Sequence, residues 1–184
     1  MRVGMLVYDG CVQFEVVLAA YFVQQRGEIM TYGLEMRDVR SAEGFQLRPD
    51  HLLSELDPEA IDAFIIPGGQ PAGILDDPIL AEKLRAMNAV GKLLAAICAA
   101  PIHLSRAGVL EGRKFTSSVY LEREGDFTTG TYTDEDLVQD GNTVTAWPNA
   151  YVDFAMALAD RLHLFVDEND RDETVRVFRE FKRG

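Results

Sequence analysis

The sequence predicts an α/β fold: a doubly wound, mostly parallel β-sheet with helices on both faces. Three observations predict it. Short apolar runs alternate with longer segments whose apolar side chains recur at helical spacing. The short runs are continuously apolar, which is typical of parallel strands buried on both faces. Glycine, proline and aspartate residues separate the segments, as expected at turns.

The first part of the chain predicts a strand, a helix, a second strand and a hairpin. Residues 2–8 form a β-rich run closed by a turn signal. Residues 12–26 repeat apolar side chains at helical spacing, and Gly27 is a suitable residue to end this helix. A strand is expected over about 28–34, and 38–49 is interpreted as a hairpin-like excursion.

The middle of the chain predicts two further strand–helix units. Residues 62–66 form a buried strand followed by a Pro-Gly-Gly loop. Asp77-Pro78 opens a helix that runs to about residue 90, with aspartate as the N-cap and proline at the first helical position. A strand over 93–97 then leads into a helix over 99–107.

The last part of the chain predicts a hairpin and two helices. Residues 138–146 form a hairpin around a Gly-Asn turn, and a long helix is expected over about 150–163. We expect Asp170 to cap a final amphipathic helix whose basic end suits the helix dipole. The apolar stripe of this last helix comprises Val175, Phe178 and Phe181.

Length and charge limit the classes of function. A chain of 184 residues predicts one domain over 1–184. The net charge of −12 argues against binding to nucleic acid or to an anionic membrane, because both require a basic face. No apolar stretch is long enough for a membrane span, and the start of the chain shows no signal peptide.

Cysteine content and missing motifs narrow the chemistry. The chain has two cysteines, Cys11 and Cys98, without a CxxC pair, so we expect no disulfide scaffold and a cytoplasmic location. No His/Cys cluster at ligand spacing and no Walker or GxGxxG loop occur, so we expect neither a metal nor a nucleotide cofactor.

Cys98 occupies the most informative position in the chain. In LLAAICAAPIHL (93–104) an apolar strand runs into a helix start with Cys98 at the corner. A residue at such a turn presents its reactive atom above the sheet. The positive helix N-terminus predicts a lowered thiol pKa, and the thiolate is the nucleophilic form. The alternative is that Cys98 is a small buried apolar residue.

Three candidate site segments follow predicted strands. Tyr8–Glu15, Pro67–Gln70 and Cys98–Pro101 each begin where a strand ends. Ligands of open parallel sheets bind beyond the carboxyl ends of the strands, at a switch point in strand order. The sequence therefore predicts a site at this edge.

Several segments together resemble a known family. AAICAAP (95–101) resembles the nucleophile elbow of the ThiJ/PfpI superfamily, and FIIPGGQ (64–70) resembles its Pro-Gly-Gly loop. FEVV (14–17) is similar to the stretch that carries the acidic partner of the cysteine. Residues 108–118 and 145–162 are also similar to family segments. The resemblance implies a flavodoxin-like, class I glutamine amidotransferase-like fold.

The resemblance assigns expected roles to five residues. Cys98 matches the nucleophile, and Glu15 matches the acid that hydrogen-bonds the cysteine sulfur. A half-buried carboxyl beside a thiolate should have a raised pKa and could shuttle a proton. The backbone N–H groups of Gly68, Gly69 and Ala99 would form an oxyanion-binding nest. Without the resemblance, Glu15 would be interpreted as a solvated carboxylate on a helix surface.

The chain departs from the family pattern at its histidines. The protease-like branch has histidine directly after the nucleophile, where this chain has Ala99, so peptidase activity is not expected. The deglycase-like branch has a histidine in the segment where Ser117 and Ser118 stand here. We assign no role to the remaining histidines. They are His51 in a loop, His103 packed or at the surface, and His163 at a helix end.

Other residues are assigned to the surroundings of the site. Ser117, Ser118, Tyr120 and Trp147 are candidates for a pocket, although core packing of Trp147 is nearly as good an interpretation. Cys11 is interpreted as a packed or partly exposed thiol. The resemblance implies a homodimer, with the apolar face of the first helix or residues 38–49 as the contact.

The leading hypothesis is a cysteine-dependent enzyme that acts on a small-molecule electrophile, with glyoxalase-like, deglycase-like or hydratase-like chemistry. Cys98 would attack, Glu15 would move the proton and the loop N–H groups would hold the oxyanion. The alternative is a redox-sensing or protective protein whose Cys98 is oxidised to sulfinic acid without turnover. A third reading, a binding module without chemistry, predicts an ordinary thiol pKa.

Overall fold

A seven-stranded, mostly parallel sheet forms the centre of the molecule. The computed structural model describes residues 1–183. The strand order is β10-β11-β7-β6-β1-β2-β5, and only β10 runs antiparallel to its neighbour. The strands of this sheet are β1 (Arg2–Leu6), β2 (Glu28–Gly33), β5 (His51–Leu52), β6 (Ala63–Ile66), β7 (Leu93–Ile97), β10 (Leu137–Asp140) and β11 (Thr143–Ala146).

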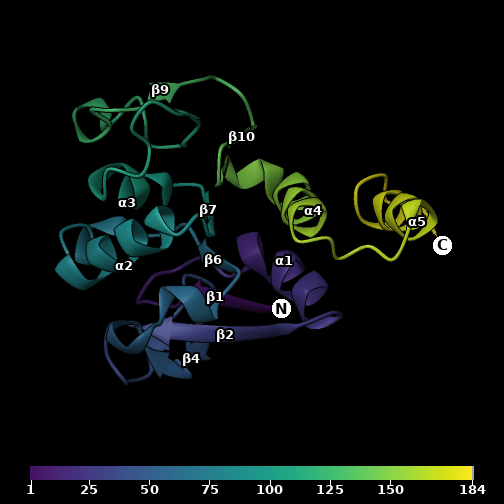
Figure 1. Cartoon of the computed structure of the whole chain (residues 1–184), viewed down its shortest axis with the longest axis horizontal. Helices are drawn as coiled ribbons and strands as arrows, with labels where there is room; N and C mark the ends of the chain where they lie inside the picture. The colour runs from purple at the N-terminus through teal and green to yellow at the C-terminus, as the bar shows by residue number, and fades with distance from the viewer. Residues whose placement is uncertain (184) are drawn as a thin grey trace.

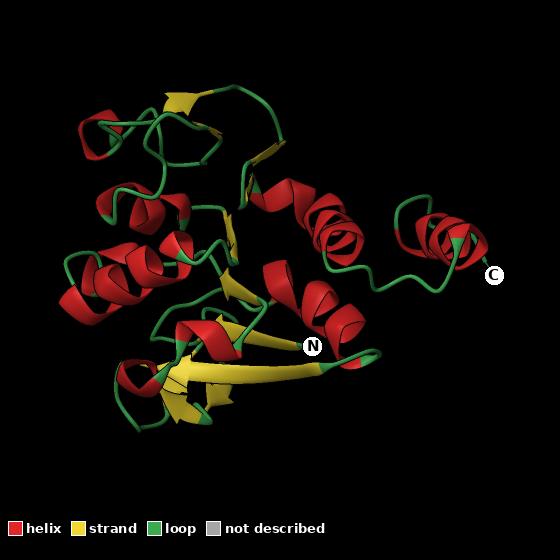
Figure 2. Cartoon of the chain, viewed as in Figure 1, coloured by secondary structure: helices red, strands yellow, loops and turns green. Residues whose placement is uncertain are grey.

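Helices cover both faces of the sheet, as the sequence predicts. In Figures 1 and 2 the strands lie between one layer made of α2 and α3 and another made of α1 and α4. Helix α5 lies outside the second layer, against α1. The helices are α1 (Phe14–Gln24), α2 (Pro78–Ala89), α3 (Pro101–Arg106), α4 (Tyr151–Arg161) and α5 (Glu168–Phe178).

Alternate side chains of the strands feed two apolar cores. Ala95 and Ile97 of β7 pack in the core beneath α1 and α4, whereas Leu94 and Ala96 pack in the core beneath α2 and α3. Successive strand residues point to opposite faces, so a strand buried on both sides is apolar throughout. This is the physical reason for the continuous apolar runs in the sequence.

The chain changes direction between β1 and β6. From β1 it moves outward to β2 and β5, and then returns to β6 on the other side of β1. All these strands are parallel, so their carboxyl ends share one edge of the sheet. The loops after β1, β6 and β7 therefore meet at a switch point, where open α/β sheets bind ligands.

The starts of two helices show how caps are made. Asp77 caps α2 by accepting hydrogen bonds from the N–H groups of Ile79 and Leu80, as predicted. Helix α1 begins at Phe14, two residues later than predicted. A residue distant in sequence supplies its cap, because Glu43 Oε1 accepts from Gln13 N and Phe14 N at 2.8 and 3.0 Å.

The 38–49 excursion is a hairpin, as predicted, and it carries Glu43. Its strands are β3 (Val39–Arg40) and β4 (Gln46–Leu47), which pair antiparallel. The predicted hairpin over 138–146 is also confirmed as β10 and β11 around Gly141, which has a positive φ of 56°.

Two predictions for the last helix were wrong. Its N-cap is Asp167, which accepts from Asp170 N, so Asp170 lies inside the first turn. Phe181 lies beyond the end of the helix and is 81% exposed. Val175 and Phe178 do pack against the core, because they point toward α1.

Several short elements carry no clear periodicity in the sequence. One is the small parallel pair β8 (Lys114–Phe115) and β9 (Thr131–Tyr132). Single turns of 3-10 helix make up the others. They are η1 (Leu53–Glu55), η2 (Pro58–Ala60), η3 (Pro71–Gly73), η4 (Glu124–Asp126) and η5 (Pro148–Ala150). None of the helices within residues 1–183 combines the length and apolar character needed to cross a membrane.

Candidate functional site

Cys98 lies at a sharp turn between β7 and α3, as predicted. Its backbone has a φ of 64°, in the left-handed region that non-glycine residues rarely adopt. The surrounding structure holds this conformation: Cys98 N donates to Ala146 O at 2.8 Å, and Cys98 O accepts from Ser118 N at 3.1 Å. Ser117 Oγ donates to the same carbonyl at 3.1 Å. The turn leaves the thiol half-buried at the sheet edge.

The carboxyl group of Glu15 lies beside the sulfur of Cys98. Glu15 is 2% exposed, and its Oε2 accepts from Gly68 N at 3.0 Å. A Cβ added at Gly68 would lie 2.5 Å from Glu15 Oε2 and 2.8 Å from Cys98 Sγ. The two reactive atoms therefore converge on one point next to the Gly68 backbone. Only glycine leaves room for this approach.

The loop after β6 is joined to the loop after β1. Gly69 forms an isolated antiparallel bridge with Cys11, through Val12 N to Gly68 O at 2.9 Å and Gln70 N to Gly10 O at 3.4 Å. Gly69 has a φ of 129°, and a Cβ there would overlap the Gly10 carbonyl. The three predicted segments thus meet, and Cys11 is a fully buried thiol within the junction.

Ser118 hydrogen-bonds the sulfur, whereas no hydrogen bond among residues 1–183 joins the other pocket candidates to it. Ser118 Oγ donates to Cys98 Sγ at 3.6 Å. Ser117 supports the Cys98 backbone instead. The ring of Tyr120 stacks on Tyr132 at 3.9 Å. Trp147 directly follows Ala146, the residue whose carbonyl holds Cys98 N.

The surroundings of Glu15 and Cys98 show that the predicted lowering of the Cys98 pKa was wrong. Burial raises the pKa of Glu15, as expected. Burial and the facing Glu15 carboxylate also raise the pKa of Cys98, although hydrogen bonds from Ser118 and the Ala99 N–H act in the opposite direction. The predicted lowering relied on a helix dipole, but α3 has only six residues. Both groups therefore resist ionisation in this site.

None of the three histidines replaces the missing catalytic histidine, since no hydrogen bond within residues 1–183 joins any of them to Cys98. His51 was expected in a loop but lies in the edge strand β5, and His163 follows α4. His103 is buried in α3, with both ring nitrogens lacking a partner among the described residues. Burial lowers the pKa of His103 to about 4.

The buried His103 makes stability depend on pH. Its pKa is lowered on folding from an ordinary value of 6.5, so its stabilising effect is complete above pH 6.5 and is lost as the pH falls toward 4. Urea unfolding at about pH 7 and pH 4.5 measures this effect. We expect wild type to lose about 2 to 3 kcal/mol more than His103→Leu over that interval. Equal losses would show that folding does not shift the pKa of His103.

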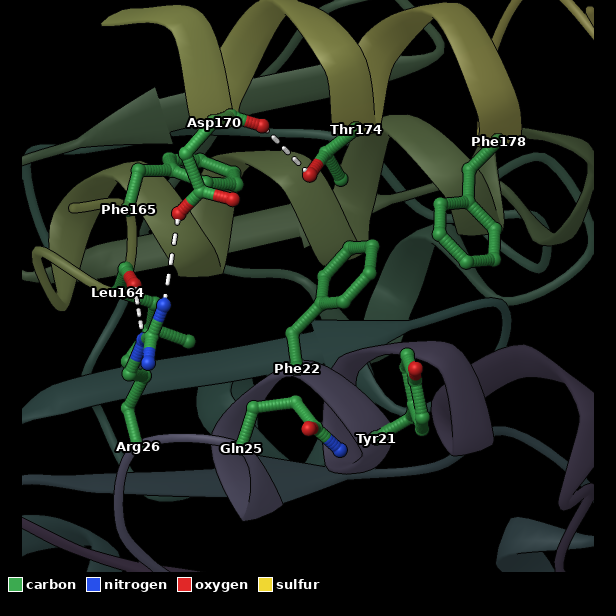
Figure 3. A pocket seen from close by; sticks show the side chains of 9 residues that line it. All are labelled: Tyr21, Phe22, Gln25, Arg26, Leu164, Phe165, Asp170, Thr174 and Phe178. Atoms are coloured by element: carbon green, nitrogen blue, oxygen red, sulfur yellow. Dashed lines mark hydrogen bonds and ion pairs between the residues drawn. The ribbon is translucent and has the colours of Figure 1, made fainter. Parts of the chain in front are cut away.

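Two hollows lie away from Cys98. One of about 350 Å³ lies beyond β1 and β2, where Arg37 pairs with Asp9 at 2.7 Å. The other, of about 240 Å³, lies between α1 and α5 (Figure 3). In that view Phe22 faces Phe178 across the hollow, and Arg26 reaches Asp170. Neither hollow is lined by a cysteine, so neither is part of the candidate site around Cys98.

Two residues that hold the site were not singled out from the sequence. Tyr8 binds the loop after β6, and Glu43 caps the helix that carries Glu15. A tyrosine hydroxyl at the end of a fully buried strand is a weak signal for the first, because such a group needs a partner. Nothing in the local sequence signals the second.

The chain is similar to known proteins both in sequence and in fold. Residues 1–161 match the sequence model of the DJ-1/PfpI family. "Deglycase TK1284" of Thermococcus kodakarensis is 30% identical over 151 residues, which are 79% of this chain and 89% of that protein. A DJ-1 superfamily protein from Agrobacterium tumefaciens, Atu0886, has 26% identity and a TM-score of 0.84, covering 98% of this chain and 99% of its own. Drosophila melanogaster DJ-1beta has 26% identity and a TM-score of 0.81, with 95% of both chains covered.

Proposed function

Because the chain belongs to the DJ-1/PfpI family, we propose that it is a cysteine-dependent enzyme that acts on a small electrophile. The observation that carries the proposal is the convergence of Cys98 Sγ and Glu15 Oε2 on one point beside Gly68. A nucleophile and a proton donor next to backbone N–H groups are the parts that addition to a carbonyl requires.

The residues act in sequence on a bound carbonyl compound. The Cys98 thiol passes its proton to the Glu15 carboxylate as the sulfur attacks the carbonyl carbon, and the carbonyl electron pair moves to oxygen. The N–H groups of Gly69 and Ala99 stabilise that oxygen, while Glu15 supplies a proton and later takes one back. Ser118 donates to the sulfur and so stabilises negative charge on it when the thiol loses its proton.

The name of the Thermococcus relative favours carbonyl adducts or reactive aldehydes as substrates. We therefore propose glyoxalase-like, deglycase-like or hydratase-like chemistry, and methylglyoxal is the first compound to test. Its consumption should be measured before and after graded alkylation with iodoacetamide, with mass spectrometry locating the label. Turnover should fall in step with labelling of Cys98. Full turnover by protein alkylated at Cys98 would contradict the proposal.

A redox-sensing role is a second candidate. It is favoured by the hydrogen-bond donors that surround the sulfur in place of a histidine, namely Ser118 and the Ala99 N–H. These donors could hold the oxygens of a sulfinic acid. Mild peroxide followed by mass spectrometry tests it, with the fully buried Cys11 as an internal reference. Oxygen addition at Cys98 no faster than at Cys11 would contradict this role.

We also propose that the chain forms a homodimer through α1. Three large side chains on this helix are about half exposed, and their spacing of three and four residues places them on one stripe. These residues are Phe14, Val17 and Tyr21. We expect sedimentation to give twice the chain mass for wild type and a lower mass for Val17→Glu. A monomeric wild type would contradict the proposal.

A further inference from the structure

A buried tyrosine ties down the loop that separates Glu15 from Cys98. Tyr8 follows β1 and is 4% exposed. Its hydroxyl lies 3.1 Å from Pro67 O and 2.9 Å from Gly68 O, so two successive carbonyl groups converge on one donor. Val12 N also donates to Gly68 O at 2.9 Å. Burial raises the pKa of Tyr8, so the hydroxyl keeps its proton.

The direction of each carbonyl fixes the direction of the N–H group in the same peptide. A trans peptide is planar, and its N–H points opposite to its C=O. The Pro67 carbonyl points to Tyr8, and the Gly68 N–H of that peptide points the other way, to Glu15 Oε2 at 3.0 Å. The same relation holds for the next peptide. Its carbonyl also points to Tyr8, so the Gly69 N–H points away from Tyr8.

Two consecutive N–H groups on one side of the backbone form a nest that attracts negative charge. Here the nest faces the side on which Glu15 and Cys98 lie. We propose that Tyr8 is a positioning residue of this site: its hydroxyl orients the peptides of Gly68 and Gly69, which then hold Glu15 and present an oxyanion donor. Tyr8 touches neither Cys98 nor a substrate in this role.

The substitution Tyr8→Phe removes the hydroxyl and keeps the ring. Tyr32→Phe is a matched control, because Tyr32 is also a buried tyrosine: it lies in β2, is 6% exposed and packs on Phe64. In ¹⁵N-glycine-labelled protein, we expect Tyr8→Phe to speed exchange of the Gly68 and Gly69 amides at least about tenfold, since the loop loses its shared anchor. Other glycine amides, and all of them in Tyr32→Phe, should exchange as in wild type.

A kinetic measurement connects the loop to the chemistry and rests on the proposed function. Misplacing one oxyanion donor should lower kcat about 10- to 100-fold with little change in KM. The pH profile of Cys98 alkylation should also move, because Glu15 loses the Gly68 N–H that lowers its pKa. The alkylation measurement does not require turnover. It therefore distinguishes a failure of the Tyr8 proposal from a failure of the proposed enzymatic function.

Unchanged Gly68 and Gly69 exchange and an unchanged alkylation profile in folded Tyr8→Phe would overturn the proposal, whether or not wild type turns over methylglyoxal. If Tyr8→Phe does not fold, wild type still provides a test. The hydroxyl proton of Tyr8 must then exchange slowly with solvent, as a buried and bonded donor does. A rapidly exchanging hydroxyl proton would overturn the proposal.

Discussion

Cys98→Ser is expected to reduce consumption of methylglyoxal at least about 10³-fold, the scale on which removal of a nucleophile acts. Serine places a hydroxyl where the thiol was, at the same positive φ of 64°. That hydroxyl keeps its proton far above neutral pH, and a carboxylate such as Glu15 is too weak a base to remove it. Steady-state kinetics at matched protein concentration measure the effect.

Cys11→Ser is the control for this variant. Cys11 is the second thiol of the chain, is fully buried, and accepts a hydrogen bond from Gln13 Nε2 at 3.2 Å that a serine oxygen can also accept. We expect its turnover to stay close to that of wild type. Equal loss in both variants would indicate damage to the junction of the loops after β1 and β6, and equal rates in Cys98→Ser and wild type would exclude Cys98 as the nucleophile.

Glu15→Gln is expected to change two rates in opposite directions. Turnover should fall about 10²- to 10⁴-fold, because the amide cannot carry a proton to and from substrate. Alkylation of Cys98 by iodoacetamide should instead become faster near neutral pH. The Glu15 carboxylate raises the pKa of Cys98, so its removal moves the midpoint of alkylation to lower pH.

Slower turnover together with faster alkylation would distinguish a chemical role of Glu15 from a structural one. A general loss of packing at the site would change both rates together, and it would appear in the free energy of unfolding. Asp153→Asn is the matched control, because Asp153 lies in the first turn of α4 and pairs with Arg179 at the surface. We expect it to leave both rates unchanged. Slower alkylation in Glu15→Gln would contradict the role assigned to the carboxylate.

The central strands and helices follow from local patterns in the sequence. Residues 93–97 and 63–66 are apolar without interruption because both faces of the sheet are covered. The Asp77-Pro78 pair marks the start of α2 correctly, since its cap is made within three residues. The resemblance to family motifs predicted that Cys98, Glu15 and the Gly68-Gly69 loop form one site. The structure also brings these residues together.

Features that depend on distant contacts could not be predicted. Glu43 caps α1 from a separate hairpin, and the two-residue strand β5 exists only because β2 offers an open edge. The pKa of Cys98 was predicted in the wrong direction because burial, which no local motif reports, outweighs the end of a short helix. The cap of α5 was misplaced by three residues because Asp167 and Asp170 both suit an N-cap.

The left-handed backbone at Cys98 lowers the stability of the fold. Most residues of the chain with a positive φ are glycines, which adopt it without steric penalty. A cysteine there is tolerated at a cost of order 1–3 kcal/mol. Glycine at this corner would relieve that strain and remove the thiol at the same time, so the strain and the thiol are tied to the same residue.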